Sequence, residues 1–331
     1  MNKGALLMNM KEIKLADVNK LVGKQKAVIA IAAMLILMLF SDSNFYSVSN
    51  FKTIFVAASP NLIIAFGVTL AVICRGCDLS VGAVMSLTGI MAVQWVNSGM
   101  NIYLAILLAS LVGALVGFIN GFLIVHQKTE AFIITLGMGM LIKGIALHLT
   151  SGNPVPVSFG NRAFMQITNY EFLGIDNIIW FALILGIFTY WLLRYTSFGR
   201  NLYALGGDYE VAEHSGINVI RAKWLAFTIT GTFAGIAGVL FASRMNTGSA
   251  IYGDPLPLMI NCAVVIGGTS FAGGVGGVVQ SALGIMVMQI LRNCMDLLKI
   301  DRFVQMLILG IVIVSIIALD CYAIKRKKED V

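Results

Sequence analysis

Few residues of this sequence have the types and spacing that catalysis or metal binding requires. The histidines stand far apart, at His126, His148 and His214. None belongs to an H-E-x-x-H zinc motif. Gly268–Ala272 reads G-T-S-F-A and misses the G-x-S-x-G nucleophile motif at its last residue. Cys74 and Cys77 have C-x-x-C spacing, but no second pair of zinc ligands accompanies them. We predict no catalytic residue and no metal site.

The sequence also lacks the usual means of powering transport by itself. No G-x-x-x-x-G-K-[ST] motif is present, so we expect no ATP hydrolysis by that route. Ion-coupled carriers usually keep acidic residues or broken helices at membrane depth. Here Lys143 is the ionisable residue deep in a predicted span, and we interpret Asp78 as a helix cap. A partner protein is therefore the expected energy source.

Composition places the chain in a membrane. Hydrophobic residues make up 58% of its 331 residues and charged residues 12%, and the mean hydropathy is +0.88. A soluble domain is close to a quarter charged, so this chain has too few polar side chains to cover one. The net charge of +7 comes largely from lysines and arginines near the two ends. Basic flanks of this kind usually report topology, and we expect no nucleic-acid partner.

Ten apolar stretches match, or nearly match, the length of a membrane span. A hydrocarbon core of about 30 Å needs roughly 20 apolar residues of helix. The predicted spans are residues 27–46, 53–74, 79–98, 102–125, 130–149, 177–194, 222–243, 258–272, 275–295 and 303–324. The eighth and ninth form either one bent span, or one full helix and one that enters part way. We predict an all-α polytopic membrane protein with about ten transmembrane helices, some short or broken.

Lysine and arginine predict the orientation. With ten spans, sixteen basic residues share the side of the two termini and six lie on the other side. Because cytoplasmic loops carry the excess of positive residues, we predict cytoplasmic basic segments at 1–26 and 325–331. Between them lies a membrane domain at 27–324, whose longest predicted external loop is Thr150–Asp176.

Small residues repeat at four-residue spacing in two predicted spans. One stripe comprises Gly113, Gly117 and Gly121, and the other comprises Gly231 and Gly235. Small residues allow close approach of helix backbones in lipid. Packing within one subunit is the favoured interpretation, and a subunit interface is the alternative.

A long polar segment interrupts the apolar chain. Residues 196–223 read TSFGRNLYALGGDYEVAEHSGINVIRAK, with six charged residues and four glycines, on the predicted cytoplasmic side. We predict a tight turn at Gly206 and Gly207 and a short helix over Glu210–Ser215. Such a helix can dock in a cleft of a partner and transmit its movement. A solvated loop is the alternative, although long ordered loops tend to be functional.

The same segment resembles the cytoplasmic coupling loop of ABC-importer permeases. The closest resemblance is to the ribose/galactose/allose type of monosaccharide permease, and it runs from Thr196 to Gly207 and on through residues 210–217. Further resemblance lies in Gly76 with Asp78–Gly82, in residues 119–121 and 132–137, and in the glycine-rich residues 264–276. These motifs stand in the family's order over roughly residues 50–320. Departures include Asp208, where asparagine is common, and Glu213, where a basic residue is frequent.

The resemblance implies a pore of two permease subunits, identical or different, in a bacterial cytoplasmic (inner) membrane. Two cytoplasmic ATP-binding subunits would drive it, and an extracytoplasmic binding protein would deliver the sugar. ATP and Mg would then be bound by the partners, and this chain would hold no cofactor. The expected coupling loop is 195–221, with the site residues Gly199, Arg200, Ala204, Gly206, Gly207, Glu210, Ala212 and Gly216. The expected structural or gating residues are Gly76, Asp78, Ser80, Gly82, Gly267 and Gly268.

Polar residues at or near membrane depth are candidates for the solute path. They are Asn61, Asn120, Lys143 and Gln289. An interhelical hydrogen bond is the alternative role for each, and the Lys143 stem can also reach an interface or a carbonyl. The leading hypothesis is a permease subunit for a monosaccharide. The alternatives are another small polar solute (an autoinducer-type sugar derivative, an inositol or a nucleoside) and a stand-alone carrier.

Overall fold

The computed structural model describes residues 26–39 and 43–329, which are mainly helical. The predicted basic segment at 1–26 lies outside the described residues except for Lys26. The helices are α2 (Lys26–Leu39), η1 (Ser43–Tyr46), α3 (Val48–Ile73), α4 (Val81–Asn97), α5 (Ile102–His126), α6 (Ala131–Thr150), α7 (Arg162–Asn169), α8 (Asn177–Tyr195), α9 (Ser197–Gly207), α10 (Tyr209–His214), α11 (Val219–Met245), α12 (Leu256–Ile266), α13 (Val278–Leu297) and α14 (Arg302–Glu329). Two antiparallel pairs of two-residue strands join β1 (Val155–Pro156) to β4 (Thr247–Gly248) and β2 (Glu171–Phe172) to β3 (Ile175–Asp176).

The all-helical, multi-pass prediction is confirmed. Among the described residues, six helices are long and apolar enough to cross a membrane: α3, α5, α6, α8, α11 and α13. The other predicted spans correspond to shorter apolar helices, at Ala27–Leu39, Val81–Asn97, Leu256–Ile266 and Arg302–Ser315. The eighth and ninth predicted spans are two separate helices. α14 runs on to Glu329, so most of the predicted tail at 325–331 continues that helix.

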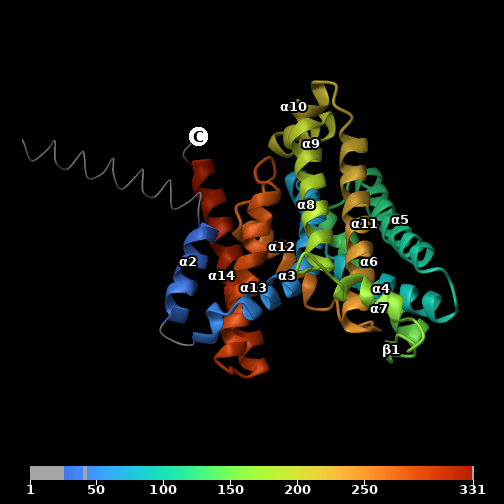
Figure 1. Cartoon of the computed structure of the whole chain (residues 1–331). Helices are drawn as coiled ribbons and strands as arrows, with labels where there is room; N and C mark the ends of the chain where they lie inside the picture. The colour runs from blue at the N-terminus through green and yellow to red at the C-terminus, as the bar shows by residue number, and fades with distance from the viewer. Residues whose placement is uncertain (1–25, 40–42, 330–331) are drawn as a thin grey trace, which may run out of the picture.

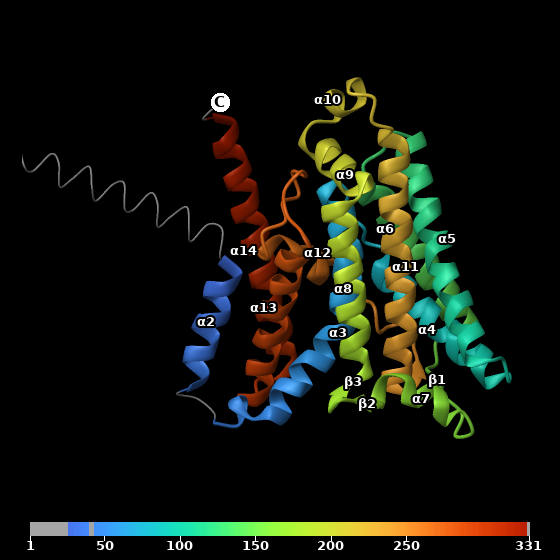
Figure 2. The same cartoon turned by 45° about the horizontal axis from the view of Figure 1, so that its top comes forward.

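The short elements gather at two opposite ends of the bundle (Figures 1 and 2). α9 and α10 lie at one end, which we call the α9–α10 end, and α14 also finishes there. α7 and the strands β1, β2 and β3 lie at the other end, which we call the hairpin end. The predicted loop at Thr150–Asp176 is therefore on the opposite side of the bundle from the polar segment.

The two glycine stripes pack against each other inside this chain. A Cβ added to Gly113 of α5 would stand 2.4 Å from the carbonyl oxygen of Gly231 of α11. A Cβ added to Gly117 would stand 2.3 Å from the carbonyl oxygen of Phe227. Backbones this close leave no room for a side chain, and in lipid such contact is a main source of helix association. The prediction of packing within one subunit is confirmed.

α4 begins part way along the bundle. It runs parallel to α11, because Met85 lies beside Gly238 and Gly89 beside both Gly238 and Ala242. Gly238 is about 10 Å from the hairpin end of α11 at a rise of 1.5 Å per residue. Val81, the first residue of α4, lies about 6 Å farther in by the same rise. α4 therefore starts about 16 Å from the end of a helix that is about 40 Å long.

α12 begins at the same depth and runs the other way. A Cβ added to Gly82 would stand 2.1 Å from the carbonyl oxygen of Gly253 and 2.9 Å from Cδ of Pro257. After α12, the amide of Gly274 donates a 2.9 Å hydrogen bond to the carbonyl of Ile73, at the α9–α10 end of α3. Two non-helical segments, 74–80 and 249–255, thus lead from opposite ends to helices that start near the middle of the bundle.

Candidate functional site

The polar segment folds as two capped helices, α9 and α10. The Thr196 hydroxyl accepts a 3.3 Å hydrogen bond from the amide of Gly199 at the start of α9. The Asp208 carboxylate accepts a 3.0 Å bond from the amide of Val211 at the start of α10. Thr and Asp are favoured at such positions because they satisfy free helix N–H groups. Gly216 follows α10 with φ +78, a conformation that glycine adopts easily. The predicted helix at Glu210–Ser215 is confirmed within one residue at each end.

The predicted turn at Gly206 and Gly207 is wrong. These glycines are the last two residues of α9, neither has positive φ, and the chain changes direction at the extended residue Asp208. Gly206 is needed for close contact instead. A Cβ added there would stand 1.8 Å from the Ile73 carbonyl oxygen and 2.3 Å from the Gly274 nitrogen. A Cβ added to Gly207 would meet nothing within 4 Å.

The eight predicted coupling residues fall on two sides of this segment. Gly199, Gly206 and Ala212 are buried against the bundle. The others are exposed at the α9–α10 end: Arg200, Ala204, Gly207, Glu210 and Gly216. The segment therefore combines a packed side with an open side that is available to another protein.

Arg75 fastens the end of α9 to the bundle. Its Nε donates a 2.9 Å hydrogen bond to the Gly206 carbonyl, and its Nη2 donates a 2.6 Å bond to the Gly207 carbonyl. A cation is favourable here because the last carbonyls of a helix carry partial negative charge. Arg75 stands in the C-R-G-C run after α3, so the feature of interest in that run is its arginine. Cys74 and Cys77 are both free thiols.

A second anchor joins α9 to the glycine-rich loop between α12 and α13. The Tyr203 hydroxyl donates a 2.8 Å hydrogen bond to the carbonyl of Gly276. Burial raises the pKa of the Tyr203 phenol, so this group stays protonated and donating at neutral pH. α9 is thus in direct contact with α3 and with the loop at 267–277. Sequence reasoning missed Arg75 and Tyr203, because no local pattern reveals partners so far apart in the chain.

Asp78 organises a buried polar cluster before α4. Its Oδ1 accepts hydrogen bonds from the Ser80 amide, at 2.8 Å, and from the Ser80 hydroxyl, at 2.6 Å. Asn120 of α5 donates a 2.9 Å bond to the same hydroxyl, and Asn261 of α12 donates a 3.0 Å bond to the Asp78 carbonyl. Asp78 is thus not a simple helix cap. It lies two residues before Ser80, the N-cap of α4, and it ties the non-helical segment 74–80 to neighbouring helices.

Each remaining motif glycine stands where a side chain would clash or where φ is positive. A Cβ added to Gly76 would stand 2.7 Å from the Phe227 ring. One added to Gly267 would stand 1.7 Å from the Gln280 carbonyl oxygen. Gly268 has φ +114, so it supplies the turn after α12. The contact of Gly82 with Gly253 places the start of α4 against the second non-helical segment.

Within the described residues, no hydrogen bond joins any two of the four residues predicted for the solute path. Asn61 is buried within α3 and Gln289 is half-buried on α13. Asn120 makes the interhelical hydrogen bond that was the alternative for it. Lys143 has a partner that was not foreseen, because its Nζ lies 2.9 Å from Oδ2 of Asp254.

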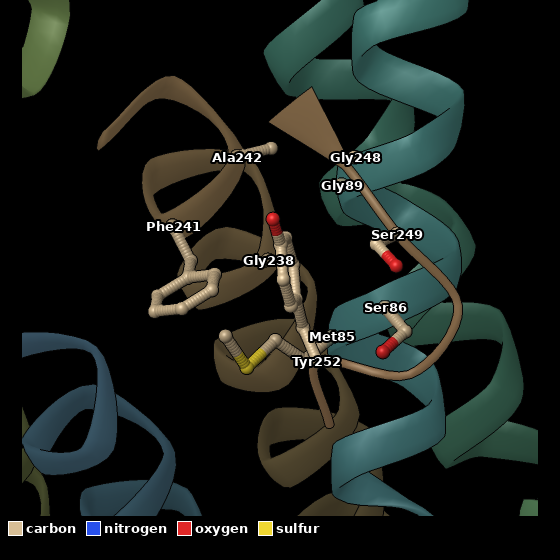
Figure 3. A pocket seen from close by; sticks show the side chains of 9 residues that line it. All are labelled: Met85, Ser86, Gly89, Gly238, Phe241, Ala242, Gly248, Ser249 and Tyr252. Carbon is tan, nitrogen blue, oxygen red and sulfur yellow. The ribbon is translucent and has the colours of Figure 1, made fainter. Parts of the chain in front are cut away.

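A hollow beside the second break holds about 10 Å³, which is room for one water molecule (Figure 3). Met85 and Ser86 of α4, Phe241 of α11 and Tyr252 of the connecting segment are among its lining residues. Ser86 accepts a 2.9 Å hydrogen bond from the Gly253 amide. This bond fixes the segment against α4, and the hollow is too small for a sugar. Over the part of the chain that the structure describes, no three His, Cys, Asp or Glu residues group as metal ligands.

Comparison with known protein families gives the broader assignment. The family described as "Branched-chain amino acid transport system / permease component" matches residues 50–317. The chain belongs to this permease family. It is accordingly a multi-pass integral membrane protein from a family of transport permeases rather than enzymes. The matched range contains both broken segments and the whole of α9 and α10.

Three curated relatives of this permease cover most of its length. The ribose import permease protein RbsC of Haemophilus influenzae is 33% identical over 92% of this chain and 95% of its own. The L-arabinose transport system permease protein AraH of Escherichia coli is 31% identical over 86% of each chain. The D-allose transport system permease protein AlsC of Escherichia coli is 32% identical over 85% of this chain and 86% of its own. No solved structure gives a significant match.

Proposed function

We propose that this permease is the membrane subunit of an ATP-driven importer for a monosaccharide delivered by an extracytoplasmic binding protein. The geometry that carries the proposal is the attachment of α9 and α10. Their open side is available to another protein, while Arg75 and Gly206 join their packed side to α3 and the glycine loop. The sugar class is supported by the names of the relatives, which are permease proteins for ribose import, L-arabinose transport and D-allose transport.

The mechanism is mechanical. ATP-binding subunits, which hold the ATP and Mg, dock on the exposed residues of α9 and α10 and move this segment as they close. Because Gly206 is in backbone contact with Ile73 and Gly274, the movement reaches α3 and the loop that follows α12. These elements rock the pore between outward and inward access. This chain contributes no cofactor of its own and pairs with a second permease subunit, identical or different.

The proposal includes topology. Together with the six long helices, the four shorter apolar helices of the described residues make up the ten helices expected in each subunit. The α9–α10 end faces the cytoplasm of a bacterium, and the hairpin end faces the binding protein outside the inner membrane. The finish of α14 at the α9–α10 end (Figure 2) supports a cytoplasmic carboxyl terminus. The excess of basic residues supports the same placement of the amino terminus.

Reconstitution tests this function. Purified permease is placed in vesicles with its ATP-binding subunits, and uptake of radiolabelled ribose, arabinose, allose, inositol and a nucleoside is measured. Omitting ATP, the ATP-binding subunits or the binding protein should each remove uptake. Uptake of only a non-sugar solute would contradict the substrate class. Uptake by the permease alone, without ATP, would contradict the mechanism.

A further inference from the structure

Lys143 and Asp254 form a half-exposed ion pair at membrane depth. The Lys143 and Asp254 side chains are 40% and 42% exposed. Lys143 lies about 10 Å from the hairpin end of α6 and about 18 Å from its other end, at 1.5 Å per residue. Asp254 follows Gly253, which contacts the start of α4 near the middle of the bundle. The helix rise and the backbone contact place the two residues about 10 to 16 Å inside the hairpin end, a difference that the long Lys143 side chain spans.

The segment beside this pair is also irregular and partly exposed. Residues 249–255 are non-helical, with turn-type hydrogen bonds from Asp254 N to Ile251 O and from Leu256 N to Gly253 O. Ile251 is 59% exposed and Leu258, at the start of α12, is 54% exposed. Irregular backbone at membrane depth occurs where it is buried in protein or lines water, and not against lipid. Charged side chains at this depth follow the same rule.

We propose that Lys143 and Asp254 are a solute-contacting pair on the wall of the water-filled path, which bind hydroxyl groups of a neutral sugar in transit. This inference rests on the proposed function and adds a specific contact to it. The two side chains make no other hydrogen bond within the described part of the chain. Lys143 thus has two further N–H donors and Asp254 a free carboxylate oxygen, which match the donor and acceptor character of sugar hydroxyls.

Water access to the pair is tested with cysteines on α6, in a variant that lacks the native cysteines. Leu141 is the matched control, because it lies at nearly the same depth, about 200° around the helix, and is 54% exposed. In assembled importers, a charged thiosulfonate reagent should modify Lys143→Cys at least about tenfold faster than Leu141→Cys. Equal rates at the two positions, whether fast or slow, would overturn the placement on the path.

Solute contact is tested with Lys143→Leu/Asp254→Leu, which leaves neither charge unpaired. The double variant should assemble and keep ATP hydrolysis stimulated by the binding protein within twofold, while sugar uptake falls at least about tenfold. If the pair were purely structural, the double variant would change ATP hydrolysis and sugar uptake together or leave both unchanged, and either result would refute the proposal. Lys143→Arg should keep uptake, because it retains the cation. If wild-type permease does not transport, the proposed function fails; if it transports and the double variant matches it, only this inference fails.

Discussion

Replacing Gly206 by alanine should uncouple ATP hydrolysis from uptake, while the same change at Gly207 should not. The new methyl group would begin 1.8 Å from the Ile73 carbonyl oxygen and 2.3 Å from the Gly274 nitrogen. Ordinary contact of a Cβ begins near 3.4 Å, so the end of α9 would have to move by about 1.5 Å. Both obstacles are backbone atoms that cannot rotate away. Overpacking of this kind costs about 1–3 kcal/mol.

The displacement also reaches the Arg75 hydrogen bonds, because both acceptors are carbonyls of the last two residues of α9. Since 1.4 kcal/mol corresponds to a factor of ten, about 1–3 kcal/mol predicts a loss of roughly five- to 150-fold in coupled uptake. The methyl group of Gly207→Ala would meet no atom within 4 Å, and the residue lies in α9 with a negative φ that alanine adopts without strain. It should leave uptake near the wild-type value and stabilise α9 slightly.

The assay measures sugar uptake and ATP hydrolysis in the same reconstituted vesicles. Gly206→Ala should hydrolyse ATP with a much lower yield of imported sugar, and its melting temperature in detergent checks that it remains folded. Equal coupling in the two alanine variants would refute the contact argument. A defect only in Gly207→Ala would instead support the turn that the paired glycines suggest in the sequence.

Three further predictions concern the anchors, the docking surface and the packing. Arg75→Leu removes two charge-assisted hydrogen bonds, and for this partly exposed residue the loss of about 1–2 kcal/mol should lower coupled uptake about tenfold. The control is Arg221→Leu, which changes an exposed arginine at the same end and should leave uptake unchanged. Equal effects of the two variants in uptake assays would contradict the role of Arg75 as an anchor. Glu210→Lys reverses an exposed charge in the first turn of α10 and should abolish binding of the ATP-binding subunits in pull-down measurements without changing membrane yield; unchanged binding and uptake would disprove the docking role. Gly113→Ala places a methyl group 2.4 Å from a backbone oxygen and should lower the melting temperature of the permease in detergent. Gly144→Ala, whose new methyl group would meet no atom within 4 Å, should not lower it. Equal melting temperatures of the two variants would contradict the close packing of α5 on α11.

Hydropathy predicted the helical, multi-pass architecture well, because a long run of apolar residues is visible in the sequence itself. It could not predict where α4 and α12 begin within the bundle. Both are apolar, and a hydropathy window cannot detect depth. Their starting points are fixed by backbone contact between Gly82 and Gly253, residues that lie far apart in the sequence.

The polar segment shows the same limit at a finer scale. Glycine spacing and the length of the segment located α10 within a residue at each end, since those signals are local. The role of Gly206 depends on Ile73 and Gly274, so its sequence context suggested a turn where the structure has a close contact. Lys143 likewise pairs with Asp254, 111 residues away, in a segment that the hydropathy pattern placed in an external loop.

Uptake of a radiolabelled monosaccharide into vesicles is the most direct test of ATP-driven sugar import by this permease. The vesicles contain the permease and its ATP-binding subunits, with ATP inside and the sugar-binding protein outside. Uptake should require all these components and stop when any one is omitted. Sugar uptake by the permease alone, at the same rate with and without ATP, would contradict this requirement.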